Sequence, residues 1–308
     1  MSKTDCYMNN LKSSLFLLVL LVTVNSVTVC QSNRKMYGVT IDAVNNINNI
    51  VTAISNHRYR MTTRIVFDEW MPATNYSVAV NKLDSVCVIM GELLDSYYVN
   101  DYTVAQYKAR TDEYMGLLGG KVDIWEIGNE VNGEWLGNKD SVLAKINYAY
   151  NKARALNYRT ALTLYYNKNC WENPQNEMFR WVNANISNDM KQNLDYVLVS
   201  YYEDDCNNLQ PNWQVVFDSL HVIFPNSNLG IGECGTTNTV RKEEYINRYY
   251  RMNITTPRYI GGYFWWYYRQ DCVPWTTKPL WGVLEYAIRA SVLMNDNYNN
   301  ELIRDGDY

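Results

Sequence analysis

Carboxylates stand directly behind several short apolar runs in the sequence, and two of them are the glutamates Glu130 and Glu233. Glu130 follows residues 124–129 (IWEIGN), and Glu233 follows residues 229–232 (LGIG). Two carboxyl groups brought together can share acid–base work, with one held protonated as an acid and the other ionised as a nucleophile or base. Cleavage of a glycosidic bond needs that division of roles. The pair therefore indicates glycoside chemistry as a first hypothesis.

Other catalytic chemistries find little support in the composition. The chain has only two histidines, His57 and His221, which leaves few candidates for a Ser-His-Asp triad and argues against a multi-histidine zinc site. No Gly-rich phosphate loop is present. The formal net charge of −4 disfavours a nucleic-acid partner, which would require a basic face. We therefore expect no metal, no cofactor and no nucleic-acid ligand.

Tyrosine and tryptophan are abundant in the chain. The 308 residues include 27 Tyr and 10 Trp but only 6 Phe. Tyr and Trp combine an apolar ring face with a polar group, so this excess predicts partly exposed rings as well as core rings. Aromatic faces can stack on sugar rings, while carboxylates and amides bind sugar hydroxyls. The composition therefore favours an oligo- or polysaccharide as the substrate.

From residue 36 onward, short apolar runs alternate with helical stretches. Several of the apolar runs are nearly continuous, as is typical of parallel strands covered on both faces. Eight strand–helix units in roughly 270 residues match a single-domain (β/α)8 TIM barrel of the α/β class, whose usual size is about 250 residues. A doubly wound sheet is less favoured, because the first strand–helix turn lacks the G-x-G-x-x-G phosphate loop. The predicted strands are 36–42, 63–68, 86–93, 122–129, 161–167, 196–202, 229–235 and 259–267, and the predicted helices are 44–58, 76–83, 104–118, 140–155, 175–182, 213–224, 242–252 and 280–294.

Polar residues gather at the carboxyl ends of the predicted strands. In a barrel of this kind, chemistry takes place where the strands end and the βα loops begin. Carboxylates and aromatic rings dominate that rim in the sequence. The residues are Asp42, Asp68, Glu69, Glu92, Asp95, Asn129, Glu130, Asn167, Tyr201, Tyr202, Glu203, Asp204, Asp205, Glu233, Trp265, Trp266 and Asp271.

Two of these strand ends resemble clan A of the retaining glycoside hydrolases. Residues 124–130 (IWEIGNE) resemble the clan's Asn-Glu signature on the fourth strand, whose Glu is the acid/base. Residues 230–235 (GIGECG) are similar to the nucleophile strand, the seventh. The resemblance extends over about residues 36–290. It implies that Glu130 is the acid/base and that Glu233 is the nucleophile.

The resemblance also implies a set of substrate-binding residues. Clan members carry an Arg on the second strand, a Tyr ending the sixth and a Trp ending the eighth. Successive strand residues face opposite sides, so only one of the two Trp candidates can point inward. The predicted set is Arg64, Asn129, Tyr201 or Tyr202, and Trp265 or Trp266.

The chain departs from the clan pattern at two positions. Val131 follows the Asn-Glu pair where many members have Pro, and Ser200 stands two residues before Tyr202 where many have His. The first departure bears on the substrate class and the second on the support of the catalytic centre. Neither removes a catalytic carboxylate.

Several carboxylates and one cysteine have a structural interpretation as well. Glu126 shares a strand with Glu130 but lies deeper, which favours a buried ion pair. Arg64 can be structural and still keep Glu233 ionised, because a neighbouring cation favours the charged form of a carboxylate. Cys234 has no histidine placed to activate it and is turned away from Glu233 by strand alternation. The rim carboxylates Asp68, Glu69, Glu92 and Glu203 have two interpretations, the binding of sugar hydroxyls and, as the favoured one, the capping of loops or exposure to solvent.

The N-terminal segment predicts export. An apolar run at 15–24 behind Lys3 and Lys12 is too short to span a membrane as a helix, so residues 1–30 are interpreted as a secretory signal peptide cleaved between Ser26 and Gln31. An uncleaved signal anchor is the alternative. We expect residues 31–295 to form the barrel and 296–308 a polar tail. After cleavage we expect no stable membrane association, and the oligomeric state stays open.

Cysteine usage fits the same compartment. No C-x-x-C pair is present, and an oxidising compartment would favour disulfides. Cys170 and Cys206 follow the fifth and sixth strands, so they should lie on neighbouring loops and form a disulfide, with Cys272 as a competing partner. Three sequons, at Asn75, Asn185 and Asn253, are compatible with glycosylation of a secreted protein.

Together these patterns predict a secreted retaining O-glycoside hydrolase that cleaves a β-linked glycan through a covalent glycosyl-enzyme. A catalytically inactive carbohydrate-binding barrel is the alternative from another class, since a fold does not guarantee turnover. A transglycosidase would use the same two glutamates with a different acceptor. The sugar and the linkage are not readable from the sequence.

Overall fold

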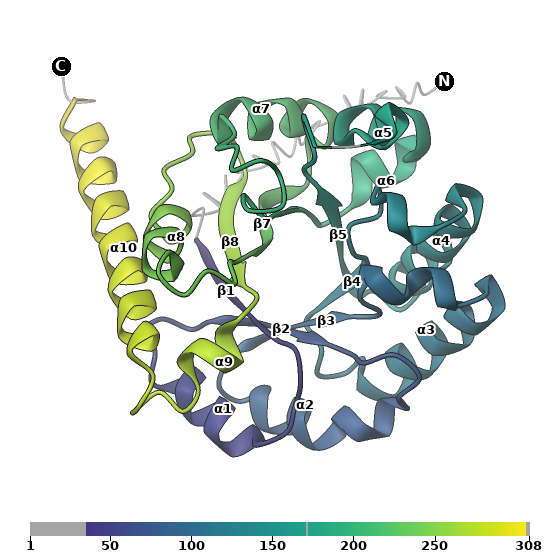
Figure 1. The fold of residues 1–308 in the computed structure, drawn as a ribbon, viewed down its shortest axis with the longest axis horizontal. Coiled ribbons are helices and arrows are strands. Elements are labelled where there is room, and N and C mark those ends of the chain that lie inside the picture. Colours follow the sequence, from purple (N-terminus) through teal and green to yellow (C-terminus); the bar gives the residue numbers. More distant parts are fainter. Residues whose placement is uncertain (1–34, 171, 306–308) are drawn as a thin grey trace, which may run out of the picture. The chain divides into compact units, whose positions relative to one another are not determined.

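The computed structural model describes residues 35–170 and 172–305, and in these residues eight parallel strands close into a barrel in the order β1 to β8 (Figure 1). Each strand pairs with its neighbour along the chain, and β1 closes the barrel on β8. The predicted (β/α)8 barrel is therefore confirmed, with every strand end within two residues of its expected place. The strands are β1 (Met36–Ile41), β2 (Thr62–Val66), β3 (Val88–Glu92), β4 (Ile124–Gly128), β5 (Arg159–Tyr165), β6 (Tyr196–Tyr201), β7 (Asn228–Cys234) and β8 (Tyr259–Trp265).

Helices cover the outside of the barrel (Figure 1). All eight predicted helices are present. Two short α-helices, α6 and α9, and four 3₁₀ helices were not predicted, because segments this short carry no complete amphipathic period. The α-helices are α1 (Ile47–Ser55), α2 (Ser77–Leu83), α3 (Val104–Leu118), α4 (Lys139–Ala155), α5 (Met178–Asn185), α6 (Asn188–Asn193), α7 (Trp213–Ile223), α8 (Lys242–Tyr250), α9 (Tyr268–Cys272) and α10 (Pro279–Asp305), and the 3₁₀ helices are η1 (Ala73–Tyr76), η2 (Ser96–Asp101), η3 (Glu134–Leu136) and η4 (Pro174–Asn176).

The apolar residues form two separate cores. The larger core lies between the strands and the surrounding helices. The smaller one includes Met90, Leu198 and Phe264 and fills the barrel interior beneath the polar residues. Gly38 in β1 makes room for the ring of Phe264, since a Cβ at this position would lie 2.6 Å from ring carbons. The interior core closes the barrel from below, so its polar side chains meet solvent only at the carboxyl ends of the strands.

The C-terminal segment differs from its prediction. Residues 296–305 continue helix α10, which runs to Asp305 beside α8 (Figure 1). The polar composition suggested a tail, but no Pro or Gly interrupts the sequence between Val283 and Gly306. Without a residue that breaks the backbone pattern, the helix has no local reason to stop.

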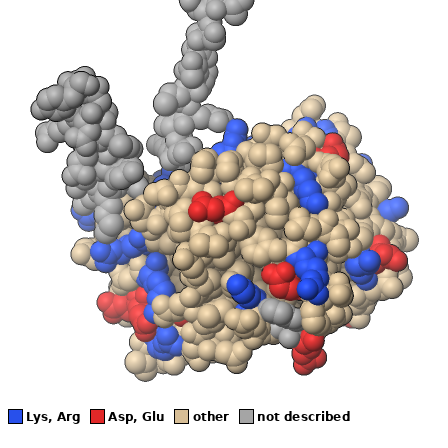
Figure 2. Space-filling model, turned by 90° about the horizontal axis from the view of Figure 1, so that it is seen from above, with Lys and Arg blue, Asp and Glu red and all other residues tan. Residues whose placement is uncertain are grey.

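Some predictions concern residues or properties that the structure does not address. The signal peptide at 1–30 lies outside the described residues. Within residues 35–170 and 172–305, no helix combines the length and apolarity needed to cross a bilayer. On the face that Figure 2 shows, acidic and basic side chains are scattered among neutral ones.

A disulfide joins two loops at the carboxyl end of the barrel. Cys170, after β5, is bonded to Cys206, after β6, with their Cα atoms 5.2 Å apart. The predicted pairing is confirmed in the structure, and the competing partner Cys272 is buried as a free thiol. The bond ties together the loops that follow Tyr165 and Tyr201, so both are held at the rim.

Removing this disulfide should lower the free energy of unfolding. The two cysteines are 36 residues apart, and closing a loop of this length is worth about 2–4 kcal/mol through the entropy of the unfolded chain. Urea unfolding of the Cys170→Ser/Cys206→Ser variant should show that loss, with a curve that reductant does not change. Reductant should shift the wild-type curve toward that of the variant. Peptide mapping that finds both cysteines alkylated in non-reduced protein would contradict the pairing.

Candidate active site

A buried arginine holds three carboxylates together at the centre of the barrel. Arg64 on β2 is completely buried and donates from Nε and Nη2 to both oxygens of Glu126, at 2.6 and 3.0 Å. Its Nη1 donates to Glu233 Oε2 at 2.6 Å, and Nη2 forms an ion pair with Glu92 at 3.1 Å. Strands β2, β3, β4 and β7 thus meet at one guanidinium, whose planar fork suits several carboxylates at once.

Glu233 lies beside two donors and is almost fully buried. Tyr202 donates to its Oε1 at 2.6 Å, opposite the bond from Arg64. Burial raises the pKa of Glu233 to about 8, although Arg64 acts in the opposite direction. The expected pairing with Arg64 is present. Burial, together with the nearby charge of Glu130, outweighs the effect of Arg64 on the pKa of Glu233.

Glu130 has a different set of partners. Ser200 donates to its Oε1 and Ser96 to its Oε2, both at 2.6 Å. Burial raises the pKa of Glu130, and the two hydroxyls oppose that rise. The residue has a left-handed backbone, with φ of 47°, a strained conformation that is common at functional sites. Ser200, the departure from the clan pattern, therefore supports Glu130 directly.

The structure shows which member of each aromatic pair, Tyr201 or Tyr202 and Trp265 or Trp266, faces the site. Tyr202 reaches Glu233, whereas Tyr201 donates to the carbonyl of Leu209 and packs outside the barrel. Trp266 lies over the Arg64 guanidinium with its ring centroid 5.7 Å away. Trp265 is completely buried on the other face of β8, where its Nε1 donates to Asp271. Tyr201 and Trp265 are therefore not at the site, because strand alternation turns them outward.

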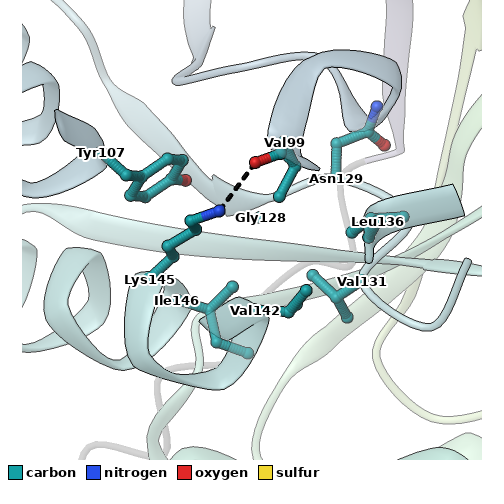
Figure 3. Close-up of a pocket in the computed structure, with 9 residues that line it drawn as sticks. All are labelled: Val99, Tyr107, Gly128, Asn129, Val131, Leu136, Val142, Lys145 and Ile146. Atoms are coloured by element: carbon teal, nitrogen blue, oxygen red, sulfur yellow. Dashed lines mark hydrogen bonds between the residues drawn. The ribbon is translucent and has the colours of Figure 1, made fainter. Parts of the chain in front are cut away.

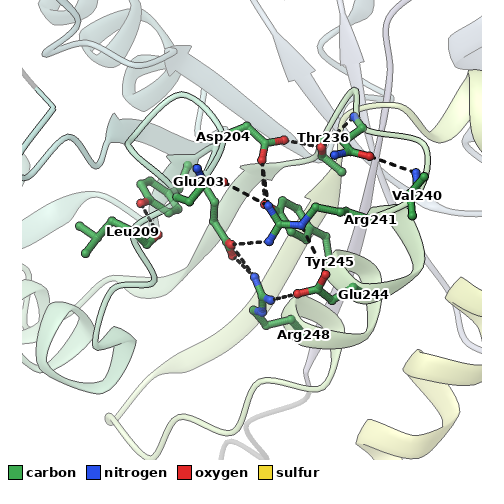
Figure 4. A network of polar contacts seen from close by, with 12 residues as sticks. Glu203, Asp204, Leu209, Thr236, Val240, Arg241, Glu244, Tyr245 and Arg248 are labelled. Atoms are coloured by element: carbon green, nitrogen blue, oxygen red, sulfur yellow. Dashed lines mark hydrogen bonds and ion pairs between the residues drawn. The ribbon is translucent and has the colours of Figure 1, made fainter.

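The loop that carries Tyr202 is fixed by ion pairs with α8. Arg248 binds the buried Glu203, and Arg241 binds Asp204 at 3.3 Å (Figure 4). Tyr245 also donates to Asp204 at 2.8 Å. Glu203 is therefore buried in an ion pair and does not face solvent, contrary to the expectation for it. The network fixes the loop that presents Tyr202 to Glu233.

Two further polar residues complete the inner wall. Asn129 precedes Glu130 and is buried, and its Oδ1 has no hydrogen-bond partner among the described residues. Thr163 on β5 donates to Glu126. The expectation of a buried ion pair at Glu126 agrees with these contacts. The expectation that Glu92 caps a loop or faces solvent is wrong, because Glu92 is buried beside Arg64. Burial raises its pKa well above the ordinary value.

A small cavity lies beneath Asn129, between the outer helices and β4. The side chain of Lys145 on α4 lines it and donates to the carbonyl of Val99 at 2.7 Å (Figure 3). Burial lowers the pKa of Lys145. Val99 belongs to η2, the 3₁₀ helix that begins with Ser96. The cavity is thus part of the support for the Ser96 loop and lies outside the barrel centre.

Sequence reasoning missed residues of the rim loops. Ser96 directly follows Asp95 after the third strand, and that position beyond a strand end was the available signal. Trp135, which donates to Ser96, and Tyr165, whose ring packs against Trp135, belong to no recognised motif. Cys234 is buried, donates to the carbonyl of Tyr263 and has a pKa raised by burial, so it is no nucleophile.

Fold and site together define a (β/α)8 barrel with two differently supported glutamates at its carboxyl end. Solved structures of Gas2p from Saccharomyces cerevisiae share this fold. The apo structure of a glutamate-to-glutamine variant of Gas2p has a TM-score of 0.55 at 10% identity, covering 85% of this chain and 62% of that one. The complex of such a variant with laminaritetraose and laminaripentaose has a TM-score of 0.51 at 12% identity, covering 77% and 57%.

These likenesses show the fold alone, and they confirm the (β/α)8 barrel that the sequence predicted. The chain spans about three-fifths of the length of the Gas2p structures it matches. Scans against protein-family models and curated proteins find no match.

The charge on Arg64 should govern stability in a pH-dependent manner. Arg64→Met leaves carboxylates buried without their cation, which costs about 3–5 kcal/mol of unfolding free energy at pH 8. Without the cation, the raised pKa values of Glu92 and Glu233 in the folded state lie further above their unfolded values. Groups raised in this way stabilise the fold at low pH and lose that contribution as the pH rises. Urea unfolding should therefore show a smaller deficit at pH 5 than at pH 8.

Arg159→Met is the matched control for this experiment. Arg159 forms an exposed ion pair with Asp123, and pairs of this kind contribute about 0–1 kcal/mol. The control should remain within about 1 kcal/mol of wild type at both pH values. An equal deficit for Arg64→Met at pH 5 and pH 8 would instead attribute its effect to packing.

Proposed function

We propose that this chain is a secreted retaining glycoside hydrolase acting on a β-linked glycan. The observation that carries the proposal is the different support of the two glutamates. Arg64 and Tyr202 donate to Glu233, and Arg64 has no acceptor to offer, so this setting favours a carboxylate. Serine hydroxyls donate or accept, so Glu130 can be accommodated in either protonation state.

In the proposed mechanism, the two glutamates share one proton. Burial raises both pKa values, so the pair retains a proton near neutral pH. The Arg64 cation and the Tyr202 hydroxyl both donate to Glu233, which favours the carboxylate there and the proton on Glu130. Glu130 protonates the leaving-group oxygen while Glu233 attacks the anomeric carbon, forming a glycosyl ester. Esterification removes the charge of Glu233. Glu130 then loses its proton more readily and activates the water that hydrolyses the ester.

Other residues would bind and orient the sugar. The unpartnered Oδ1 of Asn129 is available to accept a hydrogen bond from the sugar 2-hydroxyl, an interaction that strengthens in the transition state. The partly exposed Trp266 would form the floor of the sugar site above Arg64. The disulfide between Cys170 and Cys206 supports an oxidising, extracellular compartment.

The substrate class can be tested directly with purified protein. Laminari-oligosaccharides come first, because Gas2p was crystallised with laminaripentaose. β-Glucan, mannan, xylan and galactan complete the screen. NMR of the first-formed product should show retention of the anomeric configuration, because each of the two displacements inverts the anomeric carbon. Retaining enzymes of this kind hold their two carboxyl groups about 5–5.5 Å apart. An inverted anomer would reject the mechanism, products longer than the substrate would indicate transglycosylation, and binding without turnover would favour the inactive barrel.

Variants of the two glutamates should fail in different ways. Glu130→Ala should still cleave substrates with activated leaving groups, which need no acid, and azide should intercept the glycosyl-enzyme. Glu233→Ala should form no covalent intermediate with a 2-fluoro glycoside, whatever its leaving group. Mass spectrometry of labelled wild-type protein should place the sugar on Glu233. A label on Glu130 would reverse the roles.

A further inference from the structure

Trp135 connects the surface of the rim to the candidate acid/base. Its indole Nε1 donates to Ser96 Oγ at 3.0 Å, and Ser96 donates onward to Glu130 Oε2 at 2.6 Å. The side chain is 39% exposed, although the residue belongs to a loop that is otherwise well anchored. An exposed indole two hydrogen bonds from a buried carboxyl has no evident purpose in the packing of the barrel.

The Trp135 ring is held rigidly in place. Gly133 leaves the space it occupies, since a Cβ there would lie 2.6 Å from the indole. The buried Asn132 bonds to the backbone of Tyr165 on one side and of Asn176 on the other. Glu134 accepts two backbone N–H bonds from the loop after β5, at 2.9 and 2.7 Å. The indole is therefore preorganised, which lowers the entropic cost of binding to it.

The surroundings of the ring assign it to one side of the site. The ring of the half-buried Tyr165 meets Trp135 edge to face at 5.2 Å, and the Glu130 carboxyl is among the charges acting on Tyr165. Trp266 lies over Arg64, which binds the nucleophile Glu233. A general acid stands next to the leaving group. Trp135 is thus linked to the candidate acid Glu130 and Trp266 to the candidate nucleophile Glu233, which associates Trp135 with the leaving-group side in the proposed mechanism.

We propose that Trp135 forms the subsite for the leaving-group sugar and holds Ser96 as a donor to Glu130. This inference rests on the proposed function and names the platform for the second sugar unit. The ring face stacks on an apolar sugar face. The indole N–H occupies one acceptor position of Ser96, which directs the serine proton toward Glu130 Oε2. Trp135 is thus both a substrate-binding and a positioning residue.

Two variants separate the ring from its N–H group. Trp135→Leu removes both, and Trp135→Phe retains an aromatic face without the donor. The leaving group of laminaripentaose is a sugar, whereas that of β-laminaribiosyl fluoride is fluoride. Only the first substrate therefore needs the subsite. Trp135→Leu should lower kcat/KM for laminaripentaose about three- to tenfold and leave the fluoride within about twofold. Trp135→Phe should keep most of the activity on both.

The positioning role has its own readout in the pH profile. The basic limb of kcat/KM reports the loss of the Glu130 proton in the free enzyme. Removing a donor to a carboxylate raises its pKa, so Ser96→Ala should move this limb to higher pH. Trp135→Phe should move it less in the same direction, and the double variant should match Ser96→Ala. Tyr286→Leu, at an exposed ring on α10, is the control and should change neither readout.

Each outcome decides a separate point. If Trp135→Leu lowered kcat/KM equally for both substrates, or for neither, the proposed subsite would be overturned. An unmoved basic limb in Trp135→Phe beside a shifted limb in Ser96→Ala would overturn the positioning role. Wild-type protein that turns over neither substrate nor any glycan in the screen would reject the proposed function itself.

Discussion

One buried guanidinium sets the constraints for the rest of the site. Arg64 has no exposed surface, and it binds carboxylates from three other strands. A charge in this position would be very costly alone, and its carboxylate partners would be equally costly without it. The barrel must therefore close with the four strands in one register, and the same contact that satisfies the arginine places Glu233 at the carboxyl end of the barrel.

Because one cation serves three carboxylates, the site contains more negative than positive groups. Burial raises the pKa values of Glu92, Glu130 and Glu233, which means that protons are retained where an exposed site would lose them. For a reaction that needs one proton on a general acid, this excess of carboxyl groups is useful. The donors to the two glutamates differ, since Arg64 and Tyr202 donate to Glu233, whereas Ser96 and Ser200 donate to Glu130.

The rim loops position these groups more than the strands do. Ser96 lies on η2, which Lys145 anchors from the outer helical layer, and Trp135 lies on η3, which is anchored to the loop after β5. The loop after Tyr202 is held by ion pairs to α8 and by the disulfide at Cys206. The site therefore depends on distant loops that the strands bring to one end of the barrel.

The eight strands and the polar residues at their ends were predictable from the sequence, because buried parallel strands are continuous apolar runs and their polar ends mark the rim. The resemblance to the clan then singled out the two glutamates and Arg64. Local pattern could not choose between Tyr201 and Tyr202 or between Trp265 and Trp266. That choice depends on the side each residue faces in the closed barrel, and one step along a strand reverses it. The local pattern also could not show that Glu92 and Glu126 share Arg64. Nor could it show the hydrogen bonds that link Trp135 through Ser96 to Glu130. Those contacts join residues 28 to 62 positions apart along the chain, and only the closure of the barrel brings them together.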